Sequence, residues 1–273
     1  MLSYQHIYHA GGPADLHKHG TLALILAKMV AKDKPLSYME THAGQGYYDL
    51  ESAEAKKTGE AQQGIVRLLA ANLPPPDHPY RIVIEATRAQ FGPSCYPGSP
   101  RIAQLLLRPT DHLHLMELHP GTYSQLKRQM RGKNVSLHHR DGHEGVPAIL
   151  PPVPRRCLIL VDPSYEIKTE FAQVGKSVLR MVRQCPEAVI MLWYPLLKGN
   201  PHLPLCHTLE TANLPKLVRR ELQLHDPTRT ERMYGSGLLV INLPYDMENK
   251  LDVWEAIVVG QSAGKVFLRA RFC

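Results

Sequence analysis

The chain has 273 residues, of which 44% are hydrophobic and 21% are charged. This composition is typical of a folded protein with one sizeable core, and it excludes a mini-protein and a wholly disordered chain. The 32 Lys and Arg residues outnumber the 25 Asp and Glu residues, and the formal charge of +7 favours a polyanionic partner or a membrane surface.

The cysteines and the apolar runs bear on the compartment. The five cysteines are scattered and form no CxxC pair, which argues against a disulfide framework and a zinc ribbon. The apolar run 22–27 is far shorter than the ~20 residues that a membrane span needs. Residues 1–10 have no basic stretch followed by an apolar one, so no secretory signal is visible. We therefore expect a cytoplasmic protein, and we expect it to be a monomer.

The first hundred residues divide into two kinds of sequence. Apolar positions predict a helix over 17–32, and a short strand over 36–40 runs into the glycine turn 41–46. Residues 48–96 read as a small, mainly helical insertion. Helix-favouring residues predict a helix over 51–71, and a second helix or a strand follows at 80–90.

From Pro100 onward strands and helices alternate with short connections. The predicted strands and helices are, in chain order, 101–107 (helix), 112–117 (strand), 123–130 (helix), 135–139 (strand), 157–161 (strand), 171–184 (helix), 188–193 (strand) and 208–214 (helix). Segments 216–224, 237–243 and 254–259 add strands and a helix whose order the sequence leaves open. This alternation predicts an α/β fold with a mainly parallel, doubly wound sheet. The predicted domains are 1–47 with 97–273, interrupted by the insertion 48–96.

Acidic residues stand where several predicted strands end. They are Glu40, Glu117, Asp141 and Asp162. The carboxyl ends of strands in a doubly wound sheet face one crevice, where ligands bind. A carboxylate there can accept hydrogen bonds from both hydroxyls of a ribose. The pair Gly44 and Gly46 would let the backbone approach such a ligand, although such pairs are also common in ordinary loops.

The tetrapeptide Asp162-Pro163-Ser164-Tyr165 follows a buried strand and favours methylation of an exocyclic amine. That nitrogen is a poor nucleophile because its lone pair is delocalised into the ring. The Asp162 carboxylate and the Pro163 carbonyl can both accept hydrogen bonds from it, and Tyr165 would stack on the base. The alternative is an ordinary proline turn that Asp162 caps.

The same motif and several longer strings resemble one family. MLSYQHIYHAGGPADLHKH, THAGQGYYDL, YPGSPRIAQLLLR, ELHP, DG, LPPVPRRCLILVDPSYEIKT and LWYP follow in the order of the bacterial 23S ribosomal RNA adenine-2030 N6-methyltransferases. The resemblance covers most of the chain. It implies a Rossmann-like class I methyltransferase sheet, the helical insertion, S-adenosylmethionine as cofactor and 23S ribosomal RNA as substrate.

The resemblance also implies roles for individual residues. The implied cofactor contacts are Lys18, His19, His42, Ser99, Glu117, Asp141, Gly142 and Asp162. Asp162 would be the catalytic acceptor, with Pro163 and Tyr165 beside it, and Tyr4 and His6 would contact RNA. The family has a second proline where this chain has Ser164, and this serine adds a donor and could reorient the Pro163 carbonyl.

Three alternatives stay open beside this interpretation. The same chemistry could act on another nucleic acid such as DNA, or the chain could be a non-catalytic RNA-binding or assembly factor that Ser164 has silenced. Trp193 could form a wall of the base pocket or be an ordinary core residue. Basic clusters such as Lys127, Arg128 and Arg131 favour RNA when taken together. No HExxH or CxxC motif occurs, so we expect no metal.

Overall fold

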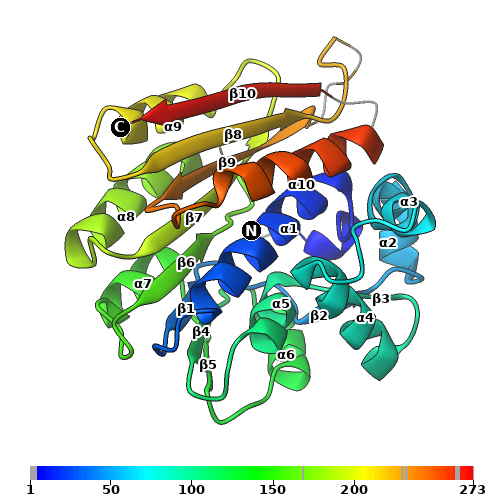
Figure 1. The fold of residues 1–273 in the computed structure, drawn as a ribbon, viewed down its shortest axis with the longest axis horizontal. Coiled ribbons are helices and arrows are strands. Elements are labelled where there is room, and N and C mark those ends of the chain that lie inside the picture. The colour runs from blue at the N-terminus through cyan, green and yellow to red at the C-terminus, as the bar shows by residue number, and fades with distance from the viewer. Residues whose placement is uncertain (1–4, 168, 229, 231–232, 262–264, 273) are drawn as a thin grey trace.

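A computed structural model describes residues 5–167, 169–228, 230, 233–261 and 265–272. Its centre is an eight-stranded sheet with the strand order β10-β8-β9-β7-β6-β1-β4-β5 (Figure 1). The strands of this sheet are β1 (Ser37–Glu40), β4 (His112–Met116), β5 (Val135–His138), β6 (Cys157–Val161), β7 (Val189–Leu196), β8 (Leu217–Gln223), β9 (Gly235–Ile241) and β10 (Lys265–Phe272). Strands β5, β4, β1, β6 and β7 are parallel neighbours, whereas β9, β8 and β10 pair antiparallel. The α/β fold with its mainly parallel half is confirmed.

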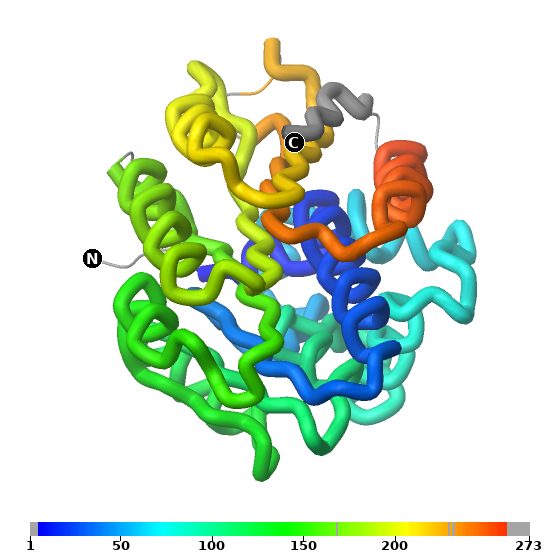
Figure 2. The backbone as a smooth tube through the Cα atoms, turned by 60° about the vertical axis from the view of Figure 1, so that its left-hand side comes forward, coloured from blue at the N-terminus to red at the C-terminus, as the bar shows by residue number. Residues whose placement is uncertain are grey.

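Helices cover both faces of the sheet (Figure 2). The larger helices are α1 (Pro13–Val30), α4 (Pro79–Phe91), α5 (Ser99–Leu106), α6 (Pro120–Gln129), α7 (Gly142–Ile149), α8 (Glu170–Gln184), α9 (Leu203–Glu210) and α10 (Glu248–Gln261). The sheet has a hydrophobic core on each face. Alternate residues of β6 belong to one core or the other, because successive strand side chains point to opposite faces. Leu158 and Leu160 pack with α1 and α10, and Ile159 packs with α7, α8 and α9.

The segment 48–96 leaves and rejoins the domain through a two-stranded sheet. Strands β2 (Tyr47–Asp49) and β3 (Cys95–Pro97) pair antiparallel at its two ends. Between them lie α2 (Ala53–Thr58), the π-helix η2 (Gln62–Val66), α3 (Arg67–Ala70) and α4. Its apolar side chains, Tyr80 and Ile84 among them, belong to the same core cluster as α1. The insertion therefore has no separate core, and the domain division stays a prediction.

Some predicted elements were wrong or absent. A single helix over 51–71 was wrong, because Gly59 ends α2 in the left-handed conformation with φ +66°. Gly64 interrupts the helical conformation again, because its φ and ψ are not helical. The next residue, Ile65, donates its backbone N–H to the Gly11 carbonyl at 2.8 Å. The helix expected at 208–214 lies earlier, as α9, and Pro204 stands in its first turn. The sequence reading also missed α7 and β10.

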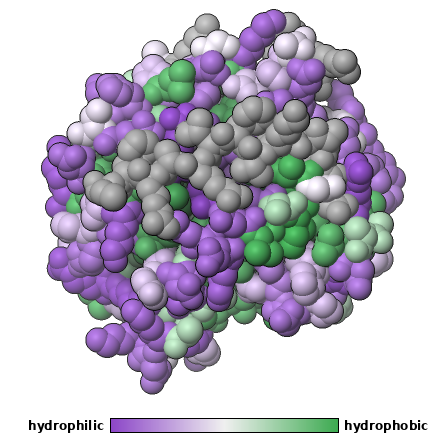
Figure 3. Space-filling view, turned by 45° about the horizontal axis from the view of Figure 1, so that its top comes forward, coloured by the Kyte–Doolittle hydropathy of each residue, from purple (hydrophilic) through white to green (hydrophobic). Residues whose placement is uncertain are grey.

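The surface in Figure 3 is mostly hydrophilic, and hydrophobic side chains gather in limited patches between polar ones. In the described part of the chain, no helix combines the length and the apolar composition that crossing a membrane requires.

A close contact between α1 and α10 fixes the position of α1. A β-carbon added at Gly20 would lie 2.0 Å from Trp254 Cε2. The Trp254 indole is buried and donates to the Leu16 carbonyl at 3.1 Å. Glycine at position 20 therefore lets the indole lie against the backbone of the helix.

The carboxyl end of β1 holds a fully buried acid. Tyr38 Oη and Ser99 Oγ donate to the two carboxylate oxygens of Glu40 at 2.5 and 3.0 Å. Burial raises the pKa of Glu40 to about 8, and the two hydroxyls oppose this shift only in part. The folded protein therefore favours protonated Glu40 at neutral pH.

We expect Gly20→Ala to lower the free energy of unfolding by about 1–3 kcal/mol or more, because the new methyl group overlaps the Trp254 ring. Denaturant unfolding measures this change. Gly260→Ala is the matched control, since Gly260 lies on α10 with open space around its added β-carbon. The control should be neutral or stabilising, because alanine favours helix. Equal effects of the two substitutions would contradict the contact.

We expect Glu40 to make stability depend on pH. Its pKa is higher in the folded state, so its contribution is complete below about pH 4.5 and is lost as pH rises through about 8. The glutamine of Glu40→Gln cannot ionise. The unfolding free energy of this variant, relative to that of the wild type, should therefore rise by at least about 1 kcal/mol between pH 5 and pH 9. Parallel pH profiles for the two proteins would show that Glu40 titrates normally.

Candidate active site

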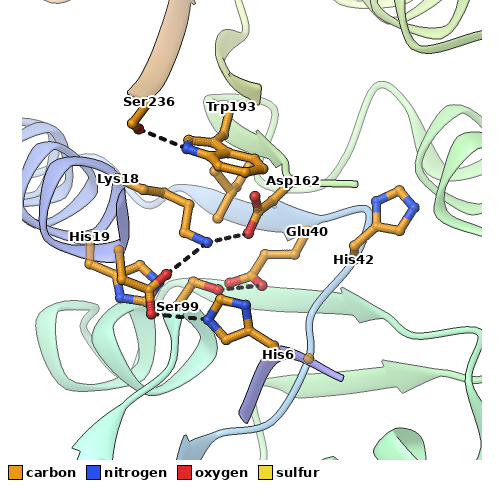
Figure 4. Close-up of polar contacts among 12 residues, drawn as sticks. His6, Lys18, His19, Glu40, His42, Ser99, Asp162, Trp193 and Ser236 are labelled. Carbon is orange, nitrogen blue, oxygen red and sulfur yellow. Dashed lines mark hydrogen bonds and ion pairs between the residues drawn. The ribbon is translucent and has the colours of Figure 1, made fainter. Parts of the chain in front are cut away.

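The four acids at the strand ends meet along one edge of the sheet. Glu40 is in register with Leu115 of β4 and Leu160 of β6, so the ends of these three strands are level. Glu117 and Asp162 follow β4 and β6 directly. Figure 4 places Glu40 and Asp162 side by side below the Trp193 ring. The edge of the sheet at which a ligand is expected thus carries Glu40, Glu117 and Asp162 close together.

A buried ammonium group links α1 to the end of β6. Lys18 Nζ lies 2.6 Å from Asp162 Oδ2 and 3.1 Å from Asp15 Oδ1 (Figure 4). Burial acts to lower the pKa of Lys18, but the charges of Asp162 and Asp15 outweigh it and raise the pKa above its usual value. Lys18 therefore stays charged and holds the Asp162 carboxylate in a fixed orientation.

Asp15 organises the N-terminal side of the site, and the sequence reading missed it. Its Oδ2 accepts from Gly11 N at 3.0 Å and lies 3.0 Å from His6 Nε2. Burial acts to raise the pKa of Asp15, but His6 and Lys18 lower it well below the usual value. A signal was available, because Asp15 and Lys18 are three apart on a helix and face the same side.

Of the two residues expected to contact RNA, His6 lies at this N-terminal side. His6 belongs to the short 3-10 helix η1 (His6–Tyr8), and its ring lies 5.3 Å from that of Tyr48. Its position next to Asp15 ties it to the Lys18–Asp162 pair. Tyr4 lies outside the described residues.

The glycine turn after β1 is held by Glu117. Gly44 N donates to Glu117 Oε2 at 2.9 Å, and His119 N donates to Oε1 at 2.8 Å. Gly44 has φ +65°, a conformation that favours glycine. Burial raises the pKa of Glu117, and the backbone donors oppose this shift. The turn and the carboxylate thus form one unit at the centre of the edge.

Asp141 and Gly142 begin α7 beside this unit. The Asp141 carboxylate accepts from His143 N at 2.7 Å and caps the helix. A β-carbon at Gly142 would lie 1.9 Å from the Thr41 carbonyl oxygen, so only glycine allows the two backbones to meet. Two of the expected cofactor contacts therefore also have a structural role.

His19 and Ser99, also expected to contact the cofactor, lie deeper. His19 is 1% exposed, and its Nδ1 lies 2.8 Å from the Tyr96 hydroxyl. Burial lowers the pKa of His19 to about 3, so its ring is neutral. Ser99 is 5% exposed and donates to Glu40. Both side chains pack behind the carboxylate edge.

The segment 162–165 leaves the end of β6 with Tyr165 folded inward. Tyr165 has φ +53° and is 7% exposed, and its ring lies 4.3 Å from that of Phe171. Its hydroxyl donates to the Trp193 carbonyl at 2.9 Å. The stacking role expected for Tyr165 stays a prediction, because its ring is covered by protein in this structure.

One group in the described part of the chain has the residue types of a metal site. His42, His143 and Glu170 bring ligand atoms within 4.8 Å of one another. Burial, and then the neighbouring His143, lower the pKa of His42 to about 3. His42 is itself an expected cofactor contact, so this cluster belongs to the same crevice. Sequence reasoning could not find it, since its members come from three separate segments.

Comparisons with known proteins agree with this geometry. The family model described as ribosomal RNA large subunit methyltransferase D, RlmJ, matches residues 33–267. A protein of Escherichia coli (strain K12) named ribosomal RNA large subunit methyltransferase J is 37% identical over 254 residues, which are 92% of this chain and 91% of the relative. A protein of the same name from Haemophilus influenzae is 36% identical over 255 residues, covering 92% and 90%.

A solved structure is similar over almost the whole chain. A Legionella pneumophila protein superimposes with a TM-score of 0.88 at 33% identity, covering 97% of this chain and 98% of its own. The sequence matches and the edge of carboxylates around Lys18 and Asp162 lead to one conclusion. The chain belongs to the RlmJ family of ribosomal RNA large subunit methyltransferases.

Proposed function

We propose that this protein transfers a methyl group from S-adenosylmethionine to N6 of an adenine in 23S ribosomal RNA. The observation that carries the proposal is the Asp162 carboxylate, which stands at the end of a buried strand and is oriented by Lys18 at 2.6 Å. The two relatives are named as methyltransferases of large-subunit ribosomal RNA, which supports the RNA substrate. Such a reaction would take place in the cytoplasm, where ribosomes are assembled.

The residues of the crevice fit the proposed cofactor. Glu117, Asp141 and Asp162 at the strand ends supply acceptors for ribose hydroxyls and negative charge for a cationic ligand. Glu117 is the best placed, since it is fixed by two backbone donors and remains 9% exposed. The other expected contacts, Lys18, His42, Asp141, Gly142 and Asp162, lie on the elements around this edge of the sheet, and the buried His19 and Ser99 bond to Tyr96 and Glu40. S-adenosylmethionine, when bound, supplies a methyl group on a sulfonium sulfur.

The chain's own contribution to the reaction is to hold the target amine. Asp162 Oδ2 is engaged by Lys18, and no donor among the described residues is assigned to Oδ1. The second carboxylate oxygen and the Pro163 carbonyl are then the two acceptors for the N6 hydrogens. Accepting both hydrogens favours a pyramidal nitrogen whose lone pair can attack. The carboxylate also stabilises the positive charge that develops on nitrogen until it loses a proton.

The RNA would approach over the N-terminal side of the crevice. His6 lies next to Asp15, and Tyr4 precedes it by two residues, so we keep both as proposed RNA contacts. The net charge of +7 would supply the attraction to phosphate that such an encounter needs. Basic residues near the C-terminus of α6, such as Lys127 and Arg128, line a groove of about 620 Å³ and are available for this role.

We expect Asp162→Asn to reduce the methylation rate by about 10²–10³-fold or more, because the amide removes the negative charge at the target nitrogen. Mass spectrometry of nucleosides from unmodified 23S RNA, after incubation with S-adenosylmethionine, measures N6-methyladenosine directly. Asp33→Asn is the control, since Asp33 is exposed and precedes β1 at the opposite edge of the sheet. Wild-type turnover in Asp162→Asn would show that Asp162 has no part in the mechanism. Absence of product from the wild type would contradict the proposed substrate.

We expect Ser164→Pro to change the rate by less than about threefold. Asp162 and Pro163 keep both acceptors in this chain, and no side-chain hydrogen bond of Ser164 is present among the described residues. Single-turnover rates of the two proteins on the same RNA measure the difference. A gain from near zero to rapid turnover would instead favour the non-catalytic RNA-binding factor.

A further inference from the structure

Trp193 lies beside the catalytic carboxylate, and the proposed mechanism does not use it. In the parallel pairing of β6 and β7, Val161 is in register with Leu192, so Trp193 is level with Asp162. Lys18 Nζ, which holds Asp162, lies 5.4 Å from the centre of the Trp193 ring. The indole is partly exposed, and Figure 4 shows it over the Lys18–Asp162 pair.

Both the side chain and the backbone of Trp193 are tied down. The indole Nε1 donates to Ser236 Oγ of β9 at 2.9 Å. The Trp193 carbonyl accepts from the Tyr165 hydroxyl at 2.9 Å, which joins it to the segment that carries Asp162. The bond from Nε1 fixes the orientation of the indole, and the strand and Tyr165 fix the backbone that carries it.

The partner of Ser236 extends this anchor into the protein. His17 Nδ1 lies 2.9 Å from Ser236 Oγ, and both side chains are fully buried. An indole nitrogen can only donate, so the serine oxygen accepts from Trp193. The other ring nitrogen of His17, Nε2, faces Glu255 Oε1 at 3.5 Å. This is an electrostatic contact, longer than an ordinary hydrogen bond.

A buried ion pair closes the chain of contacts. Arg220 Nε and one of its terminal nitrogens donate to the two oxygens of Glu255 at 2.5 and 2.8 Å. Burial acts to raise the pKa of Glu255, but His17 and Arg220 outweigh it and lower it to about 2. Glu255 is therefore ionised and favours the Nε2-protonated form of His17. The serine hydroxyl is 0% exposed and faces the indole, so this Ser-His-Glu set cannot act on a substrate itself.

We propose that the Trp193 indole is the aromatic surface against which the target base packs, and that Ser236 and His17 are positioning residues that hold the indole there. The proposal rests on the proposed methylation of a base in RNA. A base whose exocyclic amine meets Asp162 lies next to the strand end that carries Trp193. Aromatic side chains bind bases by stacking, and a ring with a fixed orientation loses little freedom when the base arrives.

The anchor can be tested through the indole signals of the protein. The chain has two tryptophans, and the Trp254 indole donates to the Leu16 carbonyl instead of to Ser236, so it serves as an internal reference. In ¹H–¹⁵N spectra, Ser236→Ala should move the Trp193 indole resonance and leave that of Trp254 in place. Ser177→Ala is the matched control, a buried serine of α8 whose hydroxyl has no partner in the described part of the chain. It should move neither resonance.

The role in binding can be tested by kinetics on 23S RNA. Trp193→Ala should raise KM for RNA by about 5- to 150-fold. Trp193→Phe keeps a ring but loses the hydrogen bond to Ser236, so its KM should rise by about 3- to 10-fold. Ser236→Ala should raise KM for RNA by about 3- to 10-fold with little change in kcat. The dissociation constant for S-adenosylmethionine, measured by calorimetry, should be unchanged in all three variants.

The outcomes separate the inference from the proposed function. An unchanged KM in Trp193→Ala, in a wild type that methylates RNA, would overturn the inference and leave the function standing. Equal losses of RNA and cofactor affinity would also overturn it, since they indicate a general structural role. If the wild type makes no product, an adenine-containing RNA oligonucleotide should still shift the Trp193 resonance. Failure of this shift would overturn the inference independently of activity.

Discussion

The buried ammonium of Lys18 is the interaction on which the site depends. A charge taken out of water is costly unless it is paired, and Lys18 has carboxylates on both sides. Removing either acid would leave a buried charge with less compensation, so the three groups hold one another. The interaction also has a geometrical effect, because it ties α1 to the end of β6. The N-terminal residues of α1 are thereby brought to the Asp162 carboxylate, the proposed catalytic acceptor.

A second buried ion pair, Arg220 and Glu255, lies behind the site. Arg220 keeps the Glu255 carboxylate ionised, and this carboxylate favours a proton on the facing Nε2 of His17. The proton position then decides the direction of the serine hydroxyl. Two buried charge pairs thus support the two sides of one crevice, one at the carboxylate and one at the indole. Their neighbours on α1, Lys18 and His17, point to different partners because successive helical residues face different directions.

Much of the framework could be predicted from the sequence. The apolar run 157–161 became β6 with the same bounds, because a strand buried on both faces needs continuous apolar side chains. The acids after the strands were found for the same reason, since a strand ends where polarity returns. The break at Gly59 and the start of α9 were not found. Helix propensity gives no weight to a left-handed glycine or to a proline in the first turn of a helix.

The supporting contacts were out of reach for a different reason. His17 and Ser236 are 219 positions apart, and Lys18 and Asp162 are 144 apart, so no local pattern joins them. The inward orientation of Tyr165 depends on Phe171 and on the Trp193 carbonyl, which only tertiary packing brings near. A motif indicates which atoms could react. The packing around it decides which faces of those residues are open.

The contact between Gly20 and Trp254 has a consequence for the synthesis of this protein. Leu16 and Trp254 are 238 positions apart, and ribosomes add roughly 5–20 residues per second, so Leu16 is added to the chain roughly 10–50 s before Trp254. During that interval α1 can already contact earlier elements such as α4 and α5, but the surface around Gly20 lacks the Trp254 indole that covers it. Lys18 and Asp162 are both made before α10. The helix that carries Lys18 is therefore packed against α10 only after the last helix has been made. The catalytic centre is therefore completed only near the end of translation, and a chain stopped before α10 would contain the motifs without the enzyme.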